Sequence, residues 1–232
     1  MSLDADQLKM AAAQSAVAQV KGGMVVGLGS GSTAKLAVDA IGRLVRDGLR
    51  IVGISTSENT TAQAKALGIP LATLADEPSI DLTIDGADEV QERSLDLIKG
   101  RGGALLREKI VASASRRLVI MVHDTKIVSR LAEHDPIPVE IVPFGWQATV
   151  RTLVELGAKP ELRKNPGGEP FVSDGGHYIF DCSFALVSAA GELASQLDHV
   201  VGVVEHGLFI GMASEVHVAG PGGVRILKAE RE

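Results

Sequence analysis

A glycine- and hydroxyl-rich segment at residues 27–33 is the first part of the sequence whose residue types suit an anion. It reads Gly-Leu-Gly-Ser-Gly-Ser-Thr and lies between a short apolar run and a segment with helical periodicity. Glycines let a ligand approach the backbone closely, and the first turn of a helix presents free N–H groups. We therefore expect a phosphate site here, with a simple tight turn as the alternative. The candidate phosphate-binding residues are Ser30, Gly31, Ser32 and Thr33.

This segment differs from the two common nucleotide-binding loops. Ser32 stands where a P-loop has its lysine, and residues 29–34 match the dinucleotide fingerprint only loosely. The next strand candidate ends in Ser55-Thr56-Ser57, which offers no acidic residue for a ribose hydroxyl. The sequence therefore favours a single phosphate that is bound with the help of hydroxyl donors.

Three carboxylates, Asp85, Asp88 and Glu89, follow another strand candidate within five residues. Carboxylates this close raise one another's pKa, and a group with a raised pKa can both take and give a proton near neutral pH. Such groups suit proton transfer on a sugar, whereas the alternative is an Asp-Gly turn with solvated acids. The six histidines show no metal-ligand spacing, so a magnesium site would depend on carboxylates alone.

Two further segments bring cations to strand ends. In residues 99–109 a glycine-rich turn leads into a helix, where Lys99 is placed to hold an oxyanion and Glu108 to act as a base. An ordinary solvated face of charged residues is the alternative. Residues 123–126 follow the most apolar strand candidate, and Lys126 there is either a phosphate contact or a surface lysine.

The elements that must position these segments alternate between strand and helix. Strands are expected at 24–28, 50–54, 80–84 and 118–122, and helices at 4–20, 33–45, 58–67 and 104–113. This alternation predicts an α/β fold with a doubly wound, mostly parallel sheet, similar to a Rossmann fold. Ligands of such sheets bind at the carboxyl ends of the strands, which is where all four polar segments fall.

A change of pattern near residue 130 predicts a second, smaller lobe. Pro136, Pro138 and Pro143 break the alternation. The expected elements are strands at 139–142, 159–162, 171–182 and 200–204 and helices at 146–156 and 189–197, followed by strands at 208–210, 215–218 and 224–227 that return to the first sheet. We therefore expect an α/β catalytic domain of residues 1–129 plus 206–232 and an inserted α+β lobe of residues 130–205 for subunit contacts.

Composition limits the classes of partner. The chain has 232 residues, of which 45% are hydrophobic and only 3% aromatic, and its formal net charge is −6. An acidic chain with few aromatic residues disfavours nucleic acid, and no apolar run approaches the roughly 20 residues that span a bilayer. The lone Cys182 excludes an intramolecular disulfide, and the first ten residues lack the plan of a signal peptide. A cytoplasmic location is expected.

Together, in this order and spacing, the polar segments resemble the type A ribose-5-phosphate isomerases over nearly the whole chain. The residues that carry the resemblance are GLGSGSTA at 27–34, Thr56-Ser57, DGADE at 85–89, KGRGGALLREKI at 99–110, the pair Asp124 and Lys126, PVEIVP at 138–143 and GLF at 207–209. The resemblance implies an α/β domain that bears the site, an inserted α+β lobe, and a homodimer or homotetramer. It also implies that neither a metal nor another cofactor is needed.

By the same resemblance, Glu108 is the base that carries a proton between C1 and C2 of a sugar phosphate. The segments that line the sugar are Asp85, Gly86, Ala87 and Asp88, and Lys99, Gly100, Arg101 and Gly102. Moving an aldose carbonyl to C2 creates a cis-enediolate, whose negative oxygens need a nearby cation. We expect Lys99 to stabilise the enediolate and either Asp85 or Asp88 to manage the hydroxyl proton and ring opening.

Two other classes share parts of this pattern. A sugar-phosphate sensor of the transcriptional-repressor type would need a DNA-binding helical module, for which the chain has no room. A glucosamine-6-phosphate deaminase-like enzyme would need a histidine near the ring, and His123 is the nearest candidate.

The sequence also departs from many relatives at Arg101, within a usually all-glycine turn, and at the hairpin of residues 173–177.

Overall fold

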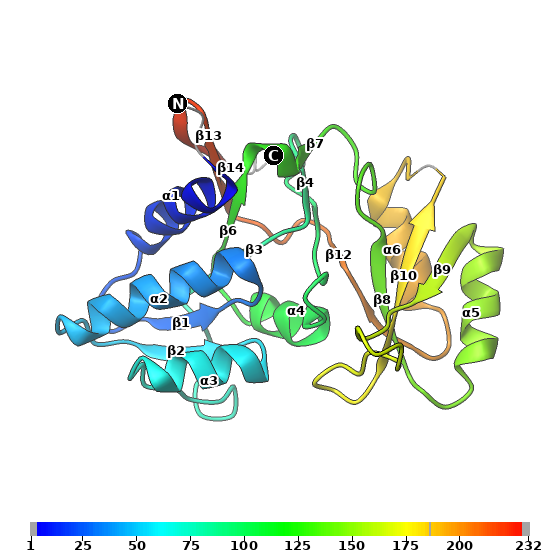
Figure 1. Ribbon diagram of the computed structural model, residues 1–232, viewed down its shortest axis with the longest axis horizontal. Helices are drawn as coiled ribbons and strands as arrows, with labels where there is room; N and C mark the ends of the chain where they lie inside the picture. Colours follow the sequence, from blue (N-terminus) through cyan, green and yellow to red (C-terminus); the bar gives the residue numbers. More distant parts are fainter. Residues whose placement is uncertain (1–3, 186, 229–232) are drawn as a thin grey trace.

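The computed structural model describes residues 4–185 and 187–228, which form two lobes side by side (Figure 1). The larger lobe is built on a six-stranded sheet in the order β14-β13-β6-β3-β1-β2. Its strands are β1 (Val25–Leu28), β2 (Val52–Ser55), β3 (Leu82–Gly86), β6 (Leu118–His123), β13 (Glu215–Gly220) and β14 (Gly223–Lys228). All neighbouring strands are parallel except β13 and β14. The predicted mostly parallel α/β sheet is confirmed.

Helices cover this sheet because its strands are apolar on both faces. The helices of the larger lobe are α1 (Ala5–Val17), α2 (Ser32–Arg46), α3 (Glu58–Ala66) and α4 (Leu105–Ser113). Val119 and Met121 of β6 pack in the core with α1 and α2, whereas Ile120 and Val122 belong to a second core that includes residues of α4 and β13. This alternation is the period of a strand buried on both sides. No helix of the described residues is long and apolar enough to cross a membrane.

The first helix and one of the last strands meet in space. α1 packs against β6 and β13, and the Ser15 hydroxyl lies 2.7 Å from Nδ1 of His217 in β13. Gln19, just after α1, also hydrogen-bonds to Glu215. The sheet of the larger lobe therefore depends on both ends of the chain.

A third, small sheet corrects one prediction about the last strands. Its order is β12-β5-β4-β7, made of β4 (Glu89–Gln91), β5 (Leu97–Ile98), β7 (Ile127–Val128) and β12 (Leu208–Phe209). Residues 208–210 were expected to return to the first sheet, and this is wrong, because β12 pairs antiparallel with β5. In the first sheet β6 already has β3 and β13 as neighbours, so neither edge of β6 is left for residues 208–210. A strand of two residues shows no periodicity from which its partner could be predicted.

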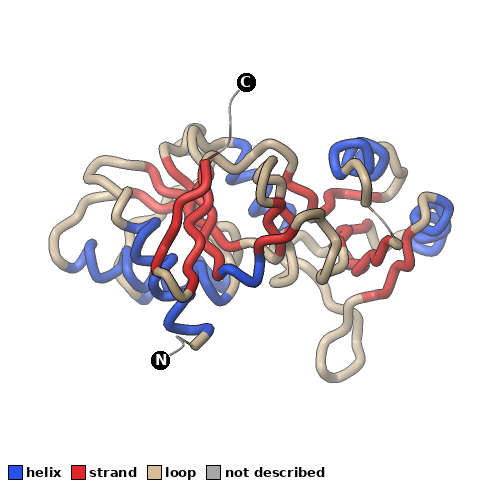
Figure 2. The backbone as a smooth tube through the Cα atoms, turned by 90° about the horizontal axis from the view of Figure 1, so that it is seen from above, coloured by secondary structure: helices blue, strands red, loops and turns tan. Residues whose placement is uncertain are grey.

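The smaller lobe is an antiparallel sheet with two helices. The sheet has the order β11-β8-β10-β9, from β8 (Ile137–Ile141), β9 (Ala158–Leu162), β10 (Tyr178–Phe184) and β11 (Val203–His206), and the helices are α5 (Trp146–Glu155) and α6 (Ala190–Asp198). Of these two helices, α5 lies at the end of the molecule away from the larger lobe (Figures 1 and 2). The predicted strand over 171–182 is wrong in its first half, because residues 171–177 make only an isolated bridge, Val172 to Tyr178.

One face of the small-lobe sheet is apolar and the other carries polar side chains. Val139 and Phe180, which pair across β8 and β10, belong to the core with α5 and α6. The next pair, Pro138 and Asp181, points to the opposite face. Asp181 and Pro138 line a pocket between this sheet and the larger lobe. The domain boundaries at 129/130 and 205/206 remain a prediction. Residues 1–3 and 229–232, which were assigned to the α/β domain, lie outside the described residues.

Candidate active site

A pocket at the carboxyl ends of β1 and β3 brings most of the predicted site residues together. It is lined by Ser30, Gly31, Ser32, Thr33, Gly86, Ala87, Asp88, Lys99, Gly100, Arg101, Gly102 and Glu108. All of these residues were predicted from the sequence as site residues. The pocket has about 390 Å³ of empty space, part of which is open to solvent. Two predicted residues, Asp85 and Lys126, are not part of its wall.

Lys99 is the buried cation of the site and lies between two carboxylates. Its Nζ is 2.9 Å from Oδ2 of Asp85 and 3.4 Å from Oε1 of Glu108, and it donates to the Gly86 carbonyl at 2.6 Å. The Lys99 side chain is only 3% exposed. Burial alone would lower the pKa of Lys99, but the negative charges of Asp85 and Glu108 outweigh burial and raise it. Lys99 therefore stays charged.

Glu108 offers one carboxylate oxygen that the protein leaves free. Its Oε2 is buried and has no hydrogen-bond partner among the described residues. The pKa of Glu108 is raised to about 8: burial raises it most, the nearby Lys99 lowers it, and the charges of Asp85 and Asp88 also raise it. A buried, unpartnered oxygen on a pocket wall is costly unless a ligand uses it. A carboxyl with this pKa can take and return a proton near neutral pH.

Asp85 lies beneath the pocket and organises the groups around it. Its Oδ1 accepts hydrogen bonds from the backbone N–H of Ser30 at 3.1 Å and of Gly86 at 2.7 Å, while Oδ2 faces Lys99. A Cβ atom on Gly29 would lie 2.1 Å from Oδ1 of Asp85, so the glycine loop can approach this carboxylate only because residue 29 has no side chain. Asp85 thus joins the loop after β1 to the catalytic lysine candidate.

Asp88 is the second acid of this segment, and unlike Asp85 it lines the pocket. Its Oδ2 accepts a hydrogen bond from the backbone N–H of Arg101 at 2.9 Å. Burial raises the pKa of Asp88, and this N–H and the charge of Lys99 partly offset the effect of burial. Of the two acids that the sequence left open for hydroxyl proton transfer, Asp88 is the one that a ligand can reach.

The glycine loop after β1 is held by a cluster of hydroxyl groups. The Ser30 hydroxyl lies within hydrogen-bond distance of Thr56 at 2.8 Å, Ser57 at 2.7 Å and Thr60 at 3.2 Å. Thr60 also donates to the Gly29 carbonyl at 3.0 Å. The Ser30 side chain therefore fixes the loop in place, and an anion in the pocket would meet the backbone of Gly31 and the residues after it.

The N-terminus of α2 lies at this loop and lacks a side-chain cap. Gly31 is its N-cap residue, with φ +93°, and makes no capping hydrogen bond from a side chain. The first N–H groups of a helix have no partner within the helix, so they can bind an anion. Thr60 of the hydroxyl cluster was missed in the sequence, although it follows the N-cap residue Ser57 of α3 at the spacing of a capped turn.

Lys126 does not reach the pocket. Its Nζ pairs with Asp135 at 3.2 Å, and Asp135 also accepts a hydrogen bond from the Arg101 guanidinium at 2.8 Å. Asp135 is held there by Glu89, a buried carboxylate that accepts four backbone N–H groups of residues 132–135. The structure thus places the third predicted carboxylate in a loop-ordering role and Lys126 beside Arg101.

The smaller lobe contributes to the surroundings of the site, which the sequence did not predict. A second cavity shares Ser30, Gly31, Ser32 and Gly102 with the first and extends to Phe171, Val172 and Asp174. Asp174 accepts a hydrogen bond from the Glu58 N–H at 2.9 Å. A Cβ atom on Gly103 would lie 2.4 Å from the Phe171 ring. Loops carry no periodicity, so nothing in the sequence indicated these contacts.

One cluster of potential metal ligands lies outside the pocket. Among the described residues, the ligand atoms of Asp198, Glu205 and His206 lie within 4.8 Å of one another. The Lys109 ammonium pairs with Glu205 at 2.5 Å, so this cluster already contains a cation. None of the three residues lines the pocket.

Comparison with known proteins gives consistent similarities. Residues 52–223 match the family model described as Ribose 5-phosphate isomerase A (phosphoriboisomerase A). The chain is 57% identical over 225 residues to the ribose-5-phosphate isomerase A of Gloeobacter violaceus, covering 97% of each chain.

Solved structures are similar over the full length. The structure of ribose 5-phosphate isomerase A from Methanocaldococcus jannaschii superimposes with a TM-score of 0.91 at 40% identity, covering 95% of this chain and 98% of that one. A D-ribose-5-phosphate isomerase in complex with phospho-erythronic acid superimposes with a TM-score of 0.94 at 34% identity, covering 97% and 100%.

Proposed function

This chain belongs to the ribose 5-phosphate isomerase A family, and from that membership we propose how its residues carry out the reaction. The enzyme interconverts D-ribose 5-phosphate and D-ribulose 5-phosphate, an aldose–ketose isomerisation of the non-oxidative pentose phosphate pathway. The steps are ring opening, transfer of a proton between C1 and C2, and transfer of a proton between the two oxygens.

Glu108 is the base that moves the proton between C1 and C2. The observation that carries this assignment is the free, buried Oε2 of Glu108 on the pocket wall. A base that removes a proton from C2 and returns it to C1 must be unprotonated before the step and protonated during it. The pKa of Glu108, raised to about 8 by burial, makes both states accessible.

Lys99 stabilises the cis-enediolate that this proton transfer creates. The negative charge of the intermediate lies on the oxygens at C1 and C2, and a buried ammonium group interacts with such charge more strongly than an exposed one. Lys99 is buried, and Asp85 holds its Nζ at 2.9 Å. Asp85 therefore acts through Lys99, whereas Asp88, on the pocket wall, exchanges the hydroxyl protons and assists ring opening.

The loop of Ser30, Gly31, Ser32 and Thr33 binds the 5-phosphate. Its support is the uncapped N-terminus of α2, where free N–H groups and the helix dipole favour an anion. The sugar then lies against Gly86, Ala87 and the turn of residues 99–102. A phosphorylated sugar acid such as phospho-erythronic acid fits this arrangement, since its carboxylate resembles the two oxygens of the enediolate.

The same chain forms a homodimer or homotetramer. Phe144 is 94% exposed and Val201 is 91% exposed, and a hydrogen bond of 2.9 Å from the Val142 N–H to the Gly202 carbonyl joins their segments. Large apolar side chains this exposed are typical of interfaces. Light scattering on the wild type and on a Phe144→Glu, Val201→Glu double variant tests this, because a wild-type monomer would contradict it.

The cytoplasm suits an enzyme with a single, buried cysteine.

The first experiment is conversion of ribose 5-phosphate by the purified protein in excess EDTA, beside Glu108→Gln. We expect turnover that survives EDTA and falls about 10²–10⁴-fold in the variant, which still binds the substrate. Glu155→Gln, an exposed change in α5, is the matched control. Full activity of Glu108→Gln would remove Glu108 from this role, and loss of turnover in EDTA would remove the metal-free mechanism. Tight binding of ribose 5-phosphate by the wild type without any turnover would instead support the alternative of a sugar-phosphate sensor.

A further inference from the structure

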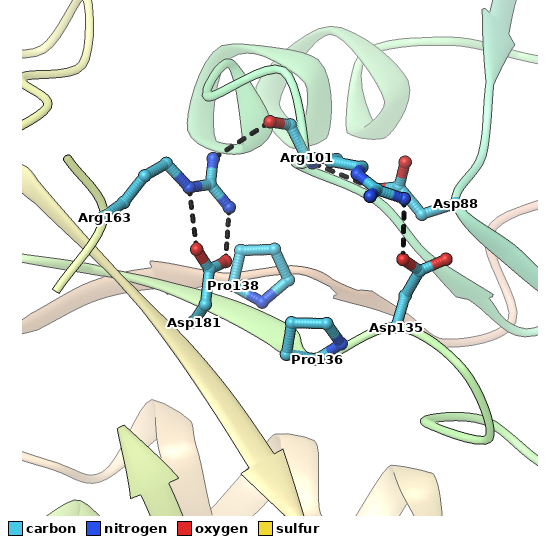
Figure 3. A pocket seen from close by; sticks show the side chains of 7 residues that line it. All are labelled: Asp88, Arg101, Asp135, Pro136, Pro138, Arg163 and Asp181. Carbon is cyan, nitrogen blue, oxygen red and sulfur yellow. Dashed lines mark hydrogen bonds and ion pairs between the residues drawn. The ribbon is translucent and has the colours of Figure 1, made fainter. Parts of the chain in front are cut away.

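An arginine of the smaller lobe reaches the turn that carries Lys99. Arg163 follows β9, and its Nη1 donates to the carbonyl of Gly100 at 2.9 Å and to the carbonyl of Arg101 at 3.1 Å. Figure 3 shows this side chain between Asp181 and Arg101, on the wall of a pocket that also contains Asp88. We call residues 99–103 the active-site turn.

The active-site turn needs an anchor outside itself. Three of its five residues are glycines, and Gly100 and Gly103 have φ of +106° and +82°. The Gly103 N–H closes the turn by donating to the Gly100 carbonyl at 2.9 Å. Glycine has the largest conformational freedom of any residue, so contacts from outside the turn are still needed to fix its geometry. Its carbonyls at positions 100 and 101 are the ones that Arg163 holds.

The Arg163 guanidinium and the Asp88 carboxylate bind opposite ends of one peptide group. The carbonyl of Gly100 and the N–H of Arg101 belong to the same peptide bond. Arg163 donates to the carbonyl end at 2.9 Å, and the N–H end donates to Oδ2 of Asp88 at 2.9 Å. A cation on the carbonyl polarises the peptide group and makes its N–H a stronger donor, because hydrogen bonds in a chain reinforce one another.

Arg163 is itself held rigidly by the small-lobe sheet. Its guanidinium makes a two-point hydrogen bond to Asp181, from Nε to Oδ2 at 3.0 Å and from Nη2 to Oδ1. Its backbone continues the ladder of β9, because its N–H donates to Ile179 and its carbonyl accepts from Phe171. Only 14% of the Arg163 side chain is exposed. A planar, two-point pair on a sheet fixes direction as well as distance.

We propose that Arg163 is a positioning residue for the isomerisation, which holds the peptide group between Gly100 and Arg101 so that its N–H stays on Asp88. The proposal rests on the proposed function in one respect, the role of Asp88 in hydroxyl proton transfer. Through the same contact the smaller lobe fixes the turn that begins at Lys99. Asp181 acts only by orienting Arg163.

The ionisation of Asp88 gives a readout that is specific to this arrangement. Several charged groups from the packed elements face this acid: Lys99 and Arg101 of the active-site turn, Glu108 of α4, Lys126, Asp135, and the Arg163–Asp181 pair. Lys99 and Lys126 lower the pKa of Asp88 and Asp135 raises it. Loss of Arg163 weakens the Arg101 N–H as a donor, so the pKa of Asp88 rises further.

The test compares Arg163→Met, Arg163→Lys and Asp181→Asn with the wild type. Methionine keeps much of the length of arginine but has neither charge nor donors, whereas lysine can still donate to one carbonyl. We expect kcat to fall about 10- to 100-fold in Arg163→Met with KM within about threefold. Arg163→Lys recovers part of kcat, and Asp181→Asn shows a smaller loss. Arg225→Met, which removes a surface arginine 3.1 Å from Glu92, is the matched control.

A second measurement does not depend on turnover. Carboxyl carbons of aspartate-labelled, ligand-free protein are titrated by NMR, with Asp88 assigned by its absence from Asp88→Asn. We expect a higher midpoint for Asp88 in Arg163→Met and no change in Arg225→Met. An unchanged Asp88 midpoint in Arg163→Met would overturn the proposal. This holds if kcat is retained, and it also holds if kcat falls together with the melting temperature. Failure of the wild type to turn over ribose 5-phosphate would instead reject the proposed function.

Discussion

The ammonium group of Lys99 and the carboxylate of Glu108 form a buried pair that uses only one of the two carboxylate oxygens. Nζ of Lys99 lies 3.4 Å from Oε1 of Glu108, and Oε2 has no hydrogen-bond partner in the described part of the chain. The lysine thus keeps Glu108, a residue of the pocket wall, in place while the other carboxylate oxygen keeps its capacity to accept a hydrogen bond or a proton. Both the activity and the stability of the protein should depend on the charge of this pair.

The pH dependence of kcat/KM should report the ionisation of Glu108. The base must be unprotonated in the free enzyme, and burial raises its pKa to about 8. We therefore expect kcat/KM to rise with pH up to about 8 and then to level off, since this parameter reports the free enzyme. Initial rates from pH 5.5 to 9.5 check this. A flat profile across that range would contradict Glu108 as the base.

Removing the carboxylate of Glu108 should stabilise the protein at alkaline pH. In the unfolded chain a glutamate has its ordinary pKa of 4.5, whereas in the folded protein the value is about 8. The folded state therefore loses stability as the pH rises from about 4.5 through about 8, because it must accept a buried charge. Glu108→Gln should be more stable than the wild type at pH 9, by on the order of 1–2 kcal/mol, and similar to it at pH 5. Urea unfolding at both pH values measures this difference.

Removing the cation should have the opposite effect. Lys99→Met leaves the buried carboxylates of Asp85 and Glu108 without their shared partner. Breaking a buried ion pair costs about 3–5 kcal/mol, and loss of an oxyanion donor costs about 10²–10³-fold in kcat. Urea unfolding and initial rates give the two values, with exposed Lys164→Met as the control. Lys99→Met with the stability of Lys164→Met would show that the pair contributes nothing.

Gly29 should tolerate no side chain. An alanine Cβ at this position would lie 2.1 Å from Oδ1 of Asp85 and 2.7 Å from its Cα, so β1 and β3 would have to separate. We expect Gly29→Ala to lose about 1–3 kcal/mol of stability and most activity. Gly22→Ala is the matched control, because its nearest neighbour would be 3.9 Å away. Equal melting temperatures for the two variants would show that Asp85 can move without cost.

The sequence predicted those parts of the fold and site that depend on local pattern. The runs at 25–28 and 118–122 carry no polar side chain, which is typical of strands buried on both faces, and both became strands of the main sheet. The pocket wall was also predictable, because residues at the carboxyl ends of parallel strands meet at one edge. Gly86 lies there at the end of β3, whereas Lys99 follows β5 of the small sheet and Glu108 lies in α4, so their places in the pocket wall depend on tertiary packing.

Long-range pairing was not predictable from local pattern. The two-residue strand at 208–209 pairs with 97–98, more than 100 residues earlier, and no periodicity in either segment indicates the other. The sequence left Lys126 as either a phosphate contact or a surface lysine, and spacing along the chain did not indicate its ion pair with Asp135. The Arg163 contact to the active-site turn depends on the packing of two lobes. Such contacts follow from tertiary structure rather than from spacing along the chain.

The meeting of α1 with β13 has a consequence for how the protein is made. β13 lies between β6 and β14 in the main sheet, and α1 packs against it. On the ribosome, α1 emerges some 200 residues before β13, which is the separation between Ser15 of α1 and its partner His217 of β13. Until the last strands are synthesised, an apolar side of α1 and one edge of β6 stay uncovered. The nascent chain should therefore acquire activity only after β13 has emerged, and its folding should be slow for its length because so many contacts join distant residues.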